Sequence, residues 1–300
     1  MLAQPERRQP PDITQLNDFL WLAPSAFLNY NSGIVISNGE ACLIDPGITP
    51  DEVERIAAFL QREGAALRTI LLTHSHWDHI LGPEHLPEAP IVTHEAYLQQ
   101  VTSYNEQIQQ SIGRWEQQLV LVRTTPFTIP TPSSTFTDQL TISVGAIDLH
   151  LIAVPGHAAD QFAVYEAETQ TFWAADMFSD LEIPFVSQSL GMYQYTIDRL
   201  NELPIALLIP GHGNPTDNSE AIADRVWEDR EYLAELRSEV AQAIGSGYSI
   251  EETVQACIAM LKSYHHTGDN TEEHKLNIES AYIELGGVTD GQAHGWARVT

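Results

Sequence analysis

The residues best suited to chemistry lie in one short stretch, His74-Ser75-His76-Trp77-Asp78-His79, which holds three imidazoles and one carboxylate. These groups are ligands for zinc, iron and manganese, and the lack of a thiolate among them argues against a closed structural zinc site. In an extended loop, residues i and i+2 point the same way, so His74 and His76 can reach one ion. Asp78 and His79 are adjacent and can turn toward a second ion. The stretch therefore predicts a metal site.

Three further candidate ligands follow downstream: His157 after Pro155-Gly156, Asp176 after Ala174-Ala175, and His212 within Pro210-Gly211-His212-Gly213. Five imidazoles and two carboxylates suit two metal ions that share a bridging water. The predicted assignment is His74, His76 and His157 on the first ion, Asp78, His79 and His212 on the second, and Asp176 as the bridge. Because two cations lower the pKa of a shared water, we expect hydroxide attack on a carbonyl or phosphorus, with Asp78 and Asp176 as catalytic carboxylates.

Each candidate ligand group follows an apolar run typical of a β-strand. These runs are residues 69–72, 148–154, 171–175 and 205–209. A sheet scaffold would thus present the ligands on loops at one rim, where functional residues usually gather. Upstream, Asn38-Gly39 between apolar runs predicts a hairpin. Thr49-Pro50-Asp51-Glu52 then predicts a capped helix that runs to Glu63 and ends at Gly64.

The remaining segments suggest two parts of different character. Residues 95–121 are expected to be helical, and residues 123–139, rich in Thr, Pro and Ser, are expected to form a loop. Beyond residue 216, helices are predicted over 217–243, from the Ser249 cap onward, and over 271–285. We therefore predict a metal-binding domain at residues 1–216 and a C-terminal helical cap at residues 217–300.

Composition limits the classes of partner. With 14 basic and 41 acidic residues, the net charge of −27 opposes binding to nucleic acid and to anionic membranes. A small-molecule substrate is expected, and a homodimer is left open. The apolar runs are too short to span a bilayer. The N-terminus lacks the apolar core of a signal peptide, so a cytoplasmic location is expected. Cys42 and Cys257 lie far apart and are expected to be reduced thiols.

Several other polar residues are predicted to support the fold. His94, at a strand end, is expected to be structural or to hold a ligand in place, and His265 and His266 are expected to face solvent. His294 is likewise not expected to bind metal. Asp45 in Ile44-Asp45-Pro46-Gly47 is either a turn residue or orients a ligand loop. For Tyr193 and Tyr195, packing is favoured over a reach into the site from a loop.

These motifs resemble the metallo-β-lactamase superfamily, in its glyoxalase II-like and lactonase-like branch. The matching residues are Thr73 to His79, Pro155-Gly156-His157, Ala175-Asp176, Pro210-Gly211-His212-Gly213 and Leu43-Ile44-Asp45-Pro46-Gly47. The resemblance implies an α/β fold, an αβ/βα four-layer sandwich of two mixed sheets, here with a C-terminal helical appendage. It also implies metals at one edge of the sandwich and hydrolysis as the chemistry.

The chain departs from both best-known branches. Gly213-Asn214-Pro215 stands where glyoxalase II has a Glu-Tyr-Thr run, and Ser179 stands where acyl-homoserine lactonases place a Tyr. We therefore expect a dinuclear hydrolase of a small ester, lactone or thioester, with zinc as the first expectation and iron or manganese as alternatives. The competing interpretations are a mononuclear iron enzyme resembling persulfide dioxygenases and a non-catalytic binding module on the same fold.

Overall fold

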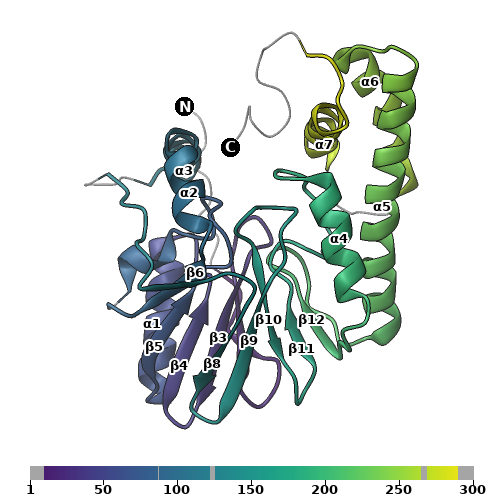
Figure 1. The fold of residues 1–300 in the computed structure, drawn as a ribbon. Coiled ribbons are helices and arrows are strands. Elements are labelled where there is room, and N and C mark those ends of the chain that lie inside the picture. The colour runs from purple at the N-terminus through teal and green to yellow at the C-terminus, as the bar shows by residue number, and fades with distance from the viewer. Residues whose placement is uncertain (1–9, 87, 122–125, 265–268, 290–300) are drawn as a thin grey trace. The chain divides into compact units, whose positions relative to one another are not determined.

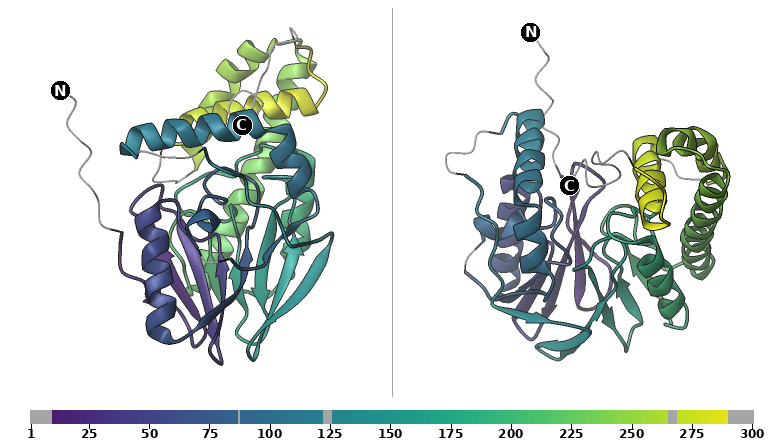
Figure 2. Two further views of the ribbon diagram at one scale, coloured as in Figure 1. Left: turned by 90° about the vertical axis from the view of Figure 1, so that its left-hand side faces the viewer. Right: turned by 45° about the horizontal axis from the view of Figure 1, so that its top comes forward.

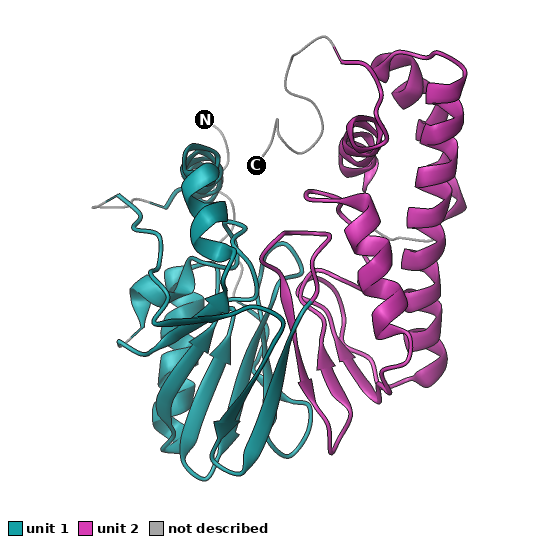
Figure 3. Ribbon diagram, viewed as in Figure 1, with its two compact units in different colours: residues 1–153, 300 teal, residues 154–299 magenta. Residues whose placement is uncertain are grey.

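The structure is a computed structural model that describes residues 10–86, 88–121, 126–264 and 269–289 of the chain. The chain divides into two compact units, residues 1–153 with residue 300, and residues 154–299 (Figure 3). The domain boundary predicted after residue 216 concerns a different division of the chain and stays a prediction.

The first unit contains a seven-stranded mixed sheet in the order β1 to β7. Figure 1 labels β3, β4, β5 and β6 of this sheet. Its first four strands pair antiparallel, and β4 to β7 pair parallel. The strands are β1 (Thr14–Gln15), β2 (Leu20–Pro24), β3 (Asn31–Ser37), β4 (Glu40–Ile44), β5 (Ala66–Leu71), β6 (Ile91–His94) and β7 (Ser134–Phe136). Because parallel strands end at the same edge, residues after β4 and β5 emerge side by side.

Local sequence signals explain the start of this unit. Asn38 and Gly39 both have positive φ, which the tight turn between β3 and β4 requires. Helix α1 (Pro50–Glu63) begins with the predicted capping box of Thr49 and Glu52. It ends at Gly64, whose left-handed conformation costs a glycine little.

Two apolar clusters cover the sheet of the first unit. One packs α1 through Ile56, Phe59 and Leu60 against Ile34 and Leu43 of β3 and β4. The other joins the sheet to α2 (Tyr97–Ser103) and α3 (Asn105–Leu119), whose change of direction is visible in Figure 2. A short 3₁₀ helix, η1 (Gly82–His85), lies between β5 and β6.

A hairpin of β8 (Gln139–Val144) and β9 (Ile147–Ala153) completes the first unit. Its turn is tied to the turn between β3 and β4, because Gly145 N–H donates to Glu40 Oε2 over 3.2 Å and Ala146 N–H donates to Ser37 Oγ over 3.0 Å. A side chain at Gly145 would lie only 2.3 Å from Ser37 O, which excludes other residues at this close approach.

In its described residues, the second unit contains three strands and four α-helices. Strand β10 (Phe162–Glu166) pairs antiparallel with β11 (Thr171–Trp173), and β11 pairs parallel with β12 (Leu207–Ile209). The helices are α4 (Leu190–Leu200), α5 (Ser219–Gly245), α6 (Ile250–Cys257) and α7 (Thr271–Glu284), with a 3₁₀ helix η2 (Ile258–Ser263) after α6. Helices α4 and α7 both pack against α5 (Figures 1 and 2).

The structure corrects two expectations and one alternative. Residues 190–200, from which Tyr193 and Tyr195 were alternatively to reach the site as part of a loop, form α4, and Ser189 caps this helix by accepting from Met192 N–H. Strand β7 lies in the segment predicted as a loop, where it extends the sheet edge beside β6. The helix predicted over 95–121 is broken at Tyr104 into α2 and α3. No helix in the described part of the chain is long and apolar enough to cross a membrane.

Candidate metal centre

The four candidate ligands of the first unit lie in a turn directly after β5. His74, Asp78 and His79 are buried, and His76 is half-buried. A main-chain hydrogen bond of 3.1 Å from His79 N–H to His76 O reverses the chain, so the four side chains gather. The ring centroid of His74 lies 4.6 Å from that of His76 and 4.0 Å from that of His79. Ligand atoms of Asp78 and His79 lie within 4.8 Å of each other.

Asp45, the residue after β4, holds this turn. Its carboxylate is fully buried and accepts three hydrogen bonds, from Thr73 N–H over 2.8 Å, Thr73 Oγ1–H over 2.6 Å and His79 Nδ1–H over 3.0 Å. The φ of Asp45 is +46°, a strained conformation that aspartate tolerates better than most residues. Tyr30 stabilises it by donating its hydroxyl to Asp45 O over 2.9 Å. Of the two roles predicted for Asp45, orienting a ligand loop is the one these bonds support.

These bonds define which nitrogen of each histidine is left for a metal. Thr73 has one hydroxyl proton and gives it to Asp45, so its oxygen accepts from His74 Nδ1–H over 3.1 Å. His79 also donates through Nδ1. In both residues Nε2 is then the lone-pair nitrogen, the arrangement found in metal-bound histidines whose other nitrogen is held by a carboxylate or carbonyl.

The second unit presents three candidate ligands from three loops. His157 follows β9, Asp176 follows β11 and His212 follows β12. Asp176 Oδ2 lies 3.4 Å from His157 Nε2 and 3.7 Å from His212 Nε2. His157 donates Nδ1–H to Phe185 O over 2.9 Å, which makes Nε2 its candidate ligand nitrogen as well.

The spacing of these atoms fits a divalent ion. A tetrahedral zinc ion with bonds of about 2.1 Å holds its ligand atoms about 3.4 Å apart, longer than an ordinary hydrogen bond. The distances of 3.4 and 3.7 Å around Asp176 are of this size. In the first unit, the distance of 3.7 Å between His79 Nε2 and Asp78 Oδ2 is of the same size. The donor set and its spacing therefore fit ligands of divalent metal ions.

Hydrogen bonds to its main-chain N–H and carbonyl fix the position of Asp176. Its N–H donates to Gln161 Oε1 over 3.3 Å, and its carbonyl accepts from Tyr193 Oη–H over 3.1 Å. Burial, and then the carboxylates of Asp229 and Asp176, raise the pKa of Tyr193 well above its ordinary value, so the phenol keeps its proton. Gly211 lies against Asp176, because a Cβ there would meet Asp176 Oδ1 at 2.5 Å.

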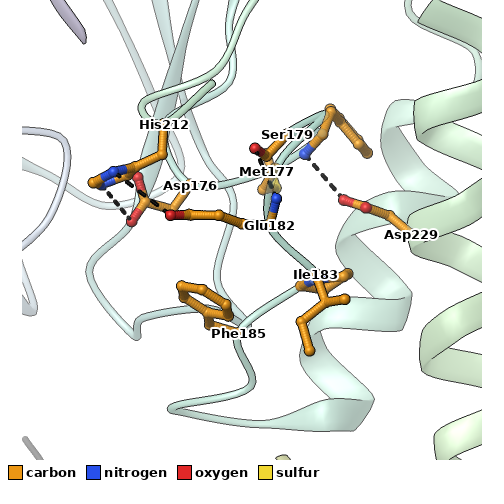
Figure 4. A pocket seen from close by; sticks show the side chains of 10 residues that line it. Asp176, Met177, Ser179, Glu182, Ile183, Phe185, His212 and Asp229 are labelled. Atoms are coloured by element: carbon orange, nitrogen blue, oxygen red, sulfur yellow. Dashed lines mark hydrogen bonds and ion pairs between the residues drawn. The ribbon is translucent and has the colours of Figure 1, made fainter. Parts of the chain in front are cut away.

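A small cavity adjoins Asp176 and His212 in the second unit (Figure 4). Its volume of about 10 Å³ is close to what one water molecule needs. Glu182 lines it, with Oε1 3.9 Å from His212 Nδ1, and Asp229 lies at its far side. Asp229 accepts from Phe178 N–H over 3.0 Å, and burial raises the pKa of its carboxyl to about 8.

The sequence model of the Metallo-beta-lactamase superfamily matches residues 26–212, more than half of the chain. The chain belongs to the metallo-β-lactamase superfamily. The predicted fold class is thereby confirmed, with two sheets, covering helices and further helices at the C-terminal end.

Curated relatives of this superfamily member share low identity. A beta-lactamase-like protein 2 homolog of Caenorhabditis elegans is 22% identical over 71% of the chain and 68% of its own length. A hydroxyacylglutathione hydrolase of Methylobacillus flagellatus is 24% identical over 71% of the chain and 76% of its own length. Another, from Xanthomonas oryzae pv. oryzae, is 30% identical over 50% of the chain and 47% of its own length.

Solved structures share the fold. A stereoselective inverting sec-alkylsulfatase of Pseudomonas sp. superposes with a TM-score of 0.69 at 16% identity. The match covers 93% of the chain but 51% of the sulfatase, so the chain spans about half of that protein. A beta-lactamase domain protein of Burkholderia ambifaria gives a TM-score of 0.68 at 14% identity, covering 93% of the chain and 90% of that protein.

The superfamily motifs thus account for the predicted ligands, which gather within each unit as described. Their predicted division between two ions stays a prediction. His94 has structural partners, Thr137 O at 2.7 Å and Ala96 N–H at 3.2 Å. His265, His266 and His294 lie outside the described residues. The sequence motif includes Thr73 but does not show its role, and no side-chain pattern indicates Gln161 or the carbonyl of Phe185.

Proposed function

We propose that the protein is a dinuclear metal-dependent hydrolase that cleaves a small ester, lactone or thioester. Membership of the metallo-β-lactamase superfamily supports the hydrolytic class. Relatives named as hydroxyacylglutathione hydrolases support an acyl substrate. Because Gly213-Asn214-Pro215 departs from the glyoxalase II pattern, the proposal names a substrate class rather than a glutathione thioester.

The observation that carries the proposal is the orientation of the imidazoles. His74 and His79 in the first unit and His157 in the second each engage Nδ1 in a hydrogen bond, so Nε2 is the ligand nitrogen in all three. Histidines with only a structural role would not be expected to share one pattern, in which Nδ1 is hydrogen-bonded and Nε2 carries the lone pair. We propose His74, His76 and His157 as ligands of one ion, Asp78, His79 and His212 as ligands of the other, and Asp176 as a ligand of both.

Two divalent ions, when bound, supply Lewis acidity: they lower the pKa of a shared water and polarise the scissile carbonyl. The residues of the chain supply orientation. Asp45 holds His79 and Thr73, and through Thr73 it holds His74. Water adds to the acyl carbon, the bond to the leaving oxygen or sulfur breaks, and Asp78 accepts the released proton and passes it to the leaving group.

Metal content and activity test the proposal together. Protein purified without chelator or affinity metal should contain about two zinc or manganese ions per chain by mass spectrometry. It should hydrolyse members of a panel of esters, lactones and thioesters. His76→Ala and Asp176→Asn should lower this activity at least about 100-fold, since the first removes a ligand and the second replaces one of two ligand oxygens by an NH₂ group. His150→Gln, on the exposed side of β9, is the matched control and should retain activity.

Two results would contradict the proposal. Unchanged activity in both ligand variants would show that the metal centre does not carry the hydrolysis. About one iron per chain together with oxygen uptake would instead indicate an oxygenase, which needs one ion rather than two.

A further inference from the structure

The loop between Asp176 and α4 carries no regular secondary structure, and we call residues 177–189 the ligand-holding loop. It contacts the metal ligand His157 twice. Phe185 O accepts the Nδ1–H of His157 over 2.9 Å, and the hydroxyl of Ser187 donates to His157 O. The position of Phe185 therefore decides which nitrogen of His157 faces a metal.

The C-terminal helices and the residue before α7 supply several hydrogen-bond partners of this loop. Asp229 of α5 accepts from Phe178 N–H over 3.0 Å. Asn270, the residue before α7, accepts from Ile183 N–H over 3.4 Å and donates to Leu181 O over 3.1 Å. These bonds replace the strand partners that the loop lacks, so the helices brace the loop that holds His157.

Asn277 of α7 lies at the centre of this bracing. Its Nδ2 donates to Pro184 O over 2.7 Å, and its Oδ1 accepts from Val186 N–H over 2.8 Å. The two bonds flank Phe185 on either side, so one fully buried amide fixes the main chain that presents the Phe185 carbonyl. The second proton of Nδ2 goes to Tyr232 Oη over 2.8 Å, so both protons of the amide have an acceptor.

We propose that Asn277 is a positioning residue for the metal ligand His157, and that α7 thereby sets the metal affinity of the protein. The inference deepens the proposed function, since it rests on the ligand role of His157. Without the amide, Pro184 O and Val186 N–H lose their buried partners and the loop must rearrange to satisfy them. The Phe185 carbonyl then moves away from His157 Nδ1, and the imidazole is no longer held in the tautomer that leaves Nε2 for a metal.

The first test compares the zinc affinity of Asn277→Ala with that of the wild type, measured by competition with a chromophoric chelator. We expect a loss of about 10- to 100-fold, the usual effect of removing a partner that orients a metal ligand. Tyr232→Phe is the matched control. It removes a hydroxyl bonded to the same amide and to His274 Nδ1 but leaves both contacts of Asn277 with the loop. It should lower the melting temperature of the metal-free protein yet keep the zinc affinity.

The second test asks whether Asn277 acts through His157. In a His157→Ala background, Asn277→Ala should cause little further loss of zinc affinity, because the group that it positions is gone. If Asn277→Ala does not fold, Asn277→Asp keeps an oxygen for Val186 N–H but sets an acceptor in place of the donor to Pro184 O and Tyr232 Oη, and it should lower the zinc affinity in the same way.

Three outcomes overturn the inference. Equal zinc affinity of Asn277→Ala and the wild type would show that the bracing does not reach the metal. An equal loss with and without His157 would show that Asn277 acts on the fold in general. A wild type that binds no zinc, iron or manganese would refute the proposed function itself, and the inference with it. That last result appears in the wild type alone, so the two failures are distinguishable.

Discussion

Replacing Asp45 by Asn should impair the first-unit ligands without altering the shape of the turn. Asn has the same outline as Asp and tolerates the left-handed conformation that residue 45 adopts, with φ of +46°. What changes is the hydrogen bonding. The carboxylate accepts from Thr73 N–H, Thr73 Oγ1–H and His79 Nδ1–H, whereas an amide has one oxygen and one NH₂.

The expected size of the effect follows from these contacts. If the amide oxygen keeps Thr73 N–H at 2.8 Å, the NH₂ faces the Thr73 hydroxyl and His79 Nδ1. His79 must then carry its proton on Nε2, and the Thr73 hydroxyl turns to donate to His74 Nδ1, which moves the His74 proton to Nε2 as well. The Nε2 atoms of His74 and His79 then both carry a proton and cannot bind a metal ion. Since one lost orienting partner costs about 10- to 100-fold, we expect a loss of at least about 100-fold in metal affinity.

The assay is zinc competition with a chromophoric chelator, with imidazole nitrogen chemical shifts of the metal-free protein to report the tautomers. The control is Asp138→Asn, which makes the same chemical change at an exposed position. Two lost charge-assisted hydrogen bonds should also lower the free energy of unfolding by about 3 kcal/mol or more. A folded Asp45→Asn protein with wild-type zinc affinity would refute the tautomer argument.

Three further predictions concern the second unit. Gly211→Ala should lower metal affinity, because the added Cβ would lie 2.5 Å from Asp176 Oδ1; Gly113→Ala, which meets nothing within 4 Å, is the matched control in the same chelator assay. Tyr193→Phe should lower the free energy of unfolding by about 1 kcal/mol in urea denaturation, since Asp176 O loses its donor. Asp229 has its pKa raised from 3.8 to about 8, so the folded protein holds this proton more tightly than the unfolded chain, and stability is lost as pH rises from about 4 to about 8. Asp229→Asn should remove this pH-dependent loss of stability, which amounts to at most about 1.4 kcal/mol per pH unit. If chemical denaturation gave the variant the same dependence of stability on pH as the wild type, the role assigned to Asp229 would be wrong.

Much of the scaffold could be predicted because its signals are local. The capping box of Thr49 and Glu52 lies within four residues, and the turn at Asn38-Gly39 is set by two. The candidate ligands could be located for the same reason, because each directly follows an apolar run. Helix α4 was missed because Gly191 and the β-branched and aromatic residues after it are weak helix formers, and packing of the buried Tyr193 and Ile197 overrides this preference.

The supports of the site could not be predicted, because they are contacts between residues far apart in the chain. Asn277 lies 91 residues from Val186, and no periodicity or motif connects them. The Phe185 carbonyl is a main-chain group that every residue possesses, so its partner His157 is set by the path of the loop. Asp45 was recognisable as a candidate, but only its distances to Thr73 and His79 distinguish the orienting role from a turn.

The bracing of the ligand-holding loop by α5 and α7 bears on how this chain can vary. Each bond pairs a side chain of α5, of α7 or of the residue before α7 with a main-chain group of the loop, so these contacts constrain the length of the loop more than its sequence. A deletion between residues 178 and 186 would shift the main-chain groups out of register with Asp229, Asn270 and Asn277 together. The C-terminal helices therefore cannot be replaced by unrelated helices, because the spacing of Asp229, Asn270 and Asn277 sets the length of the loop that carries Phe185.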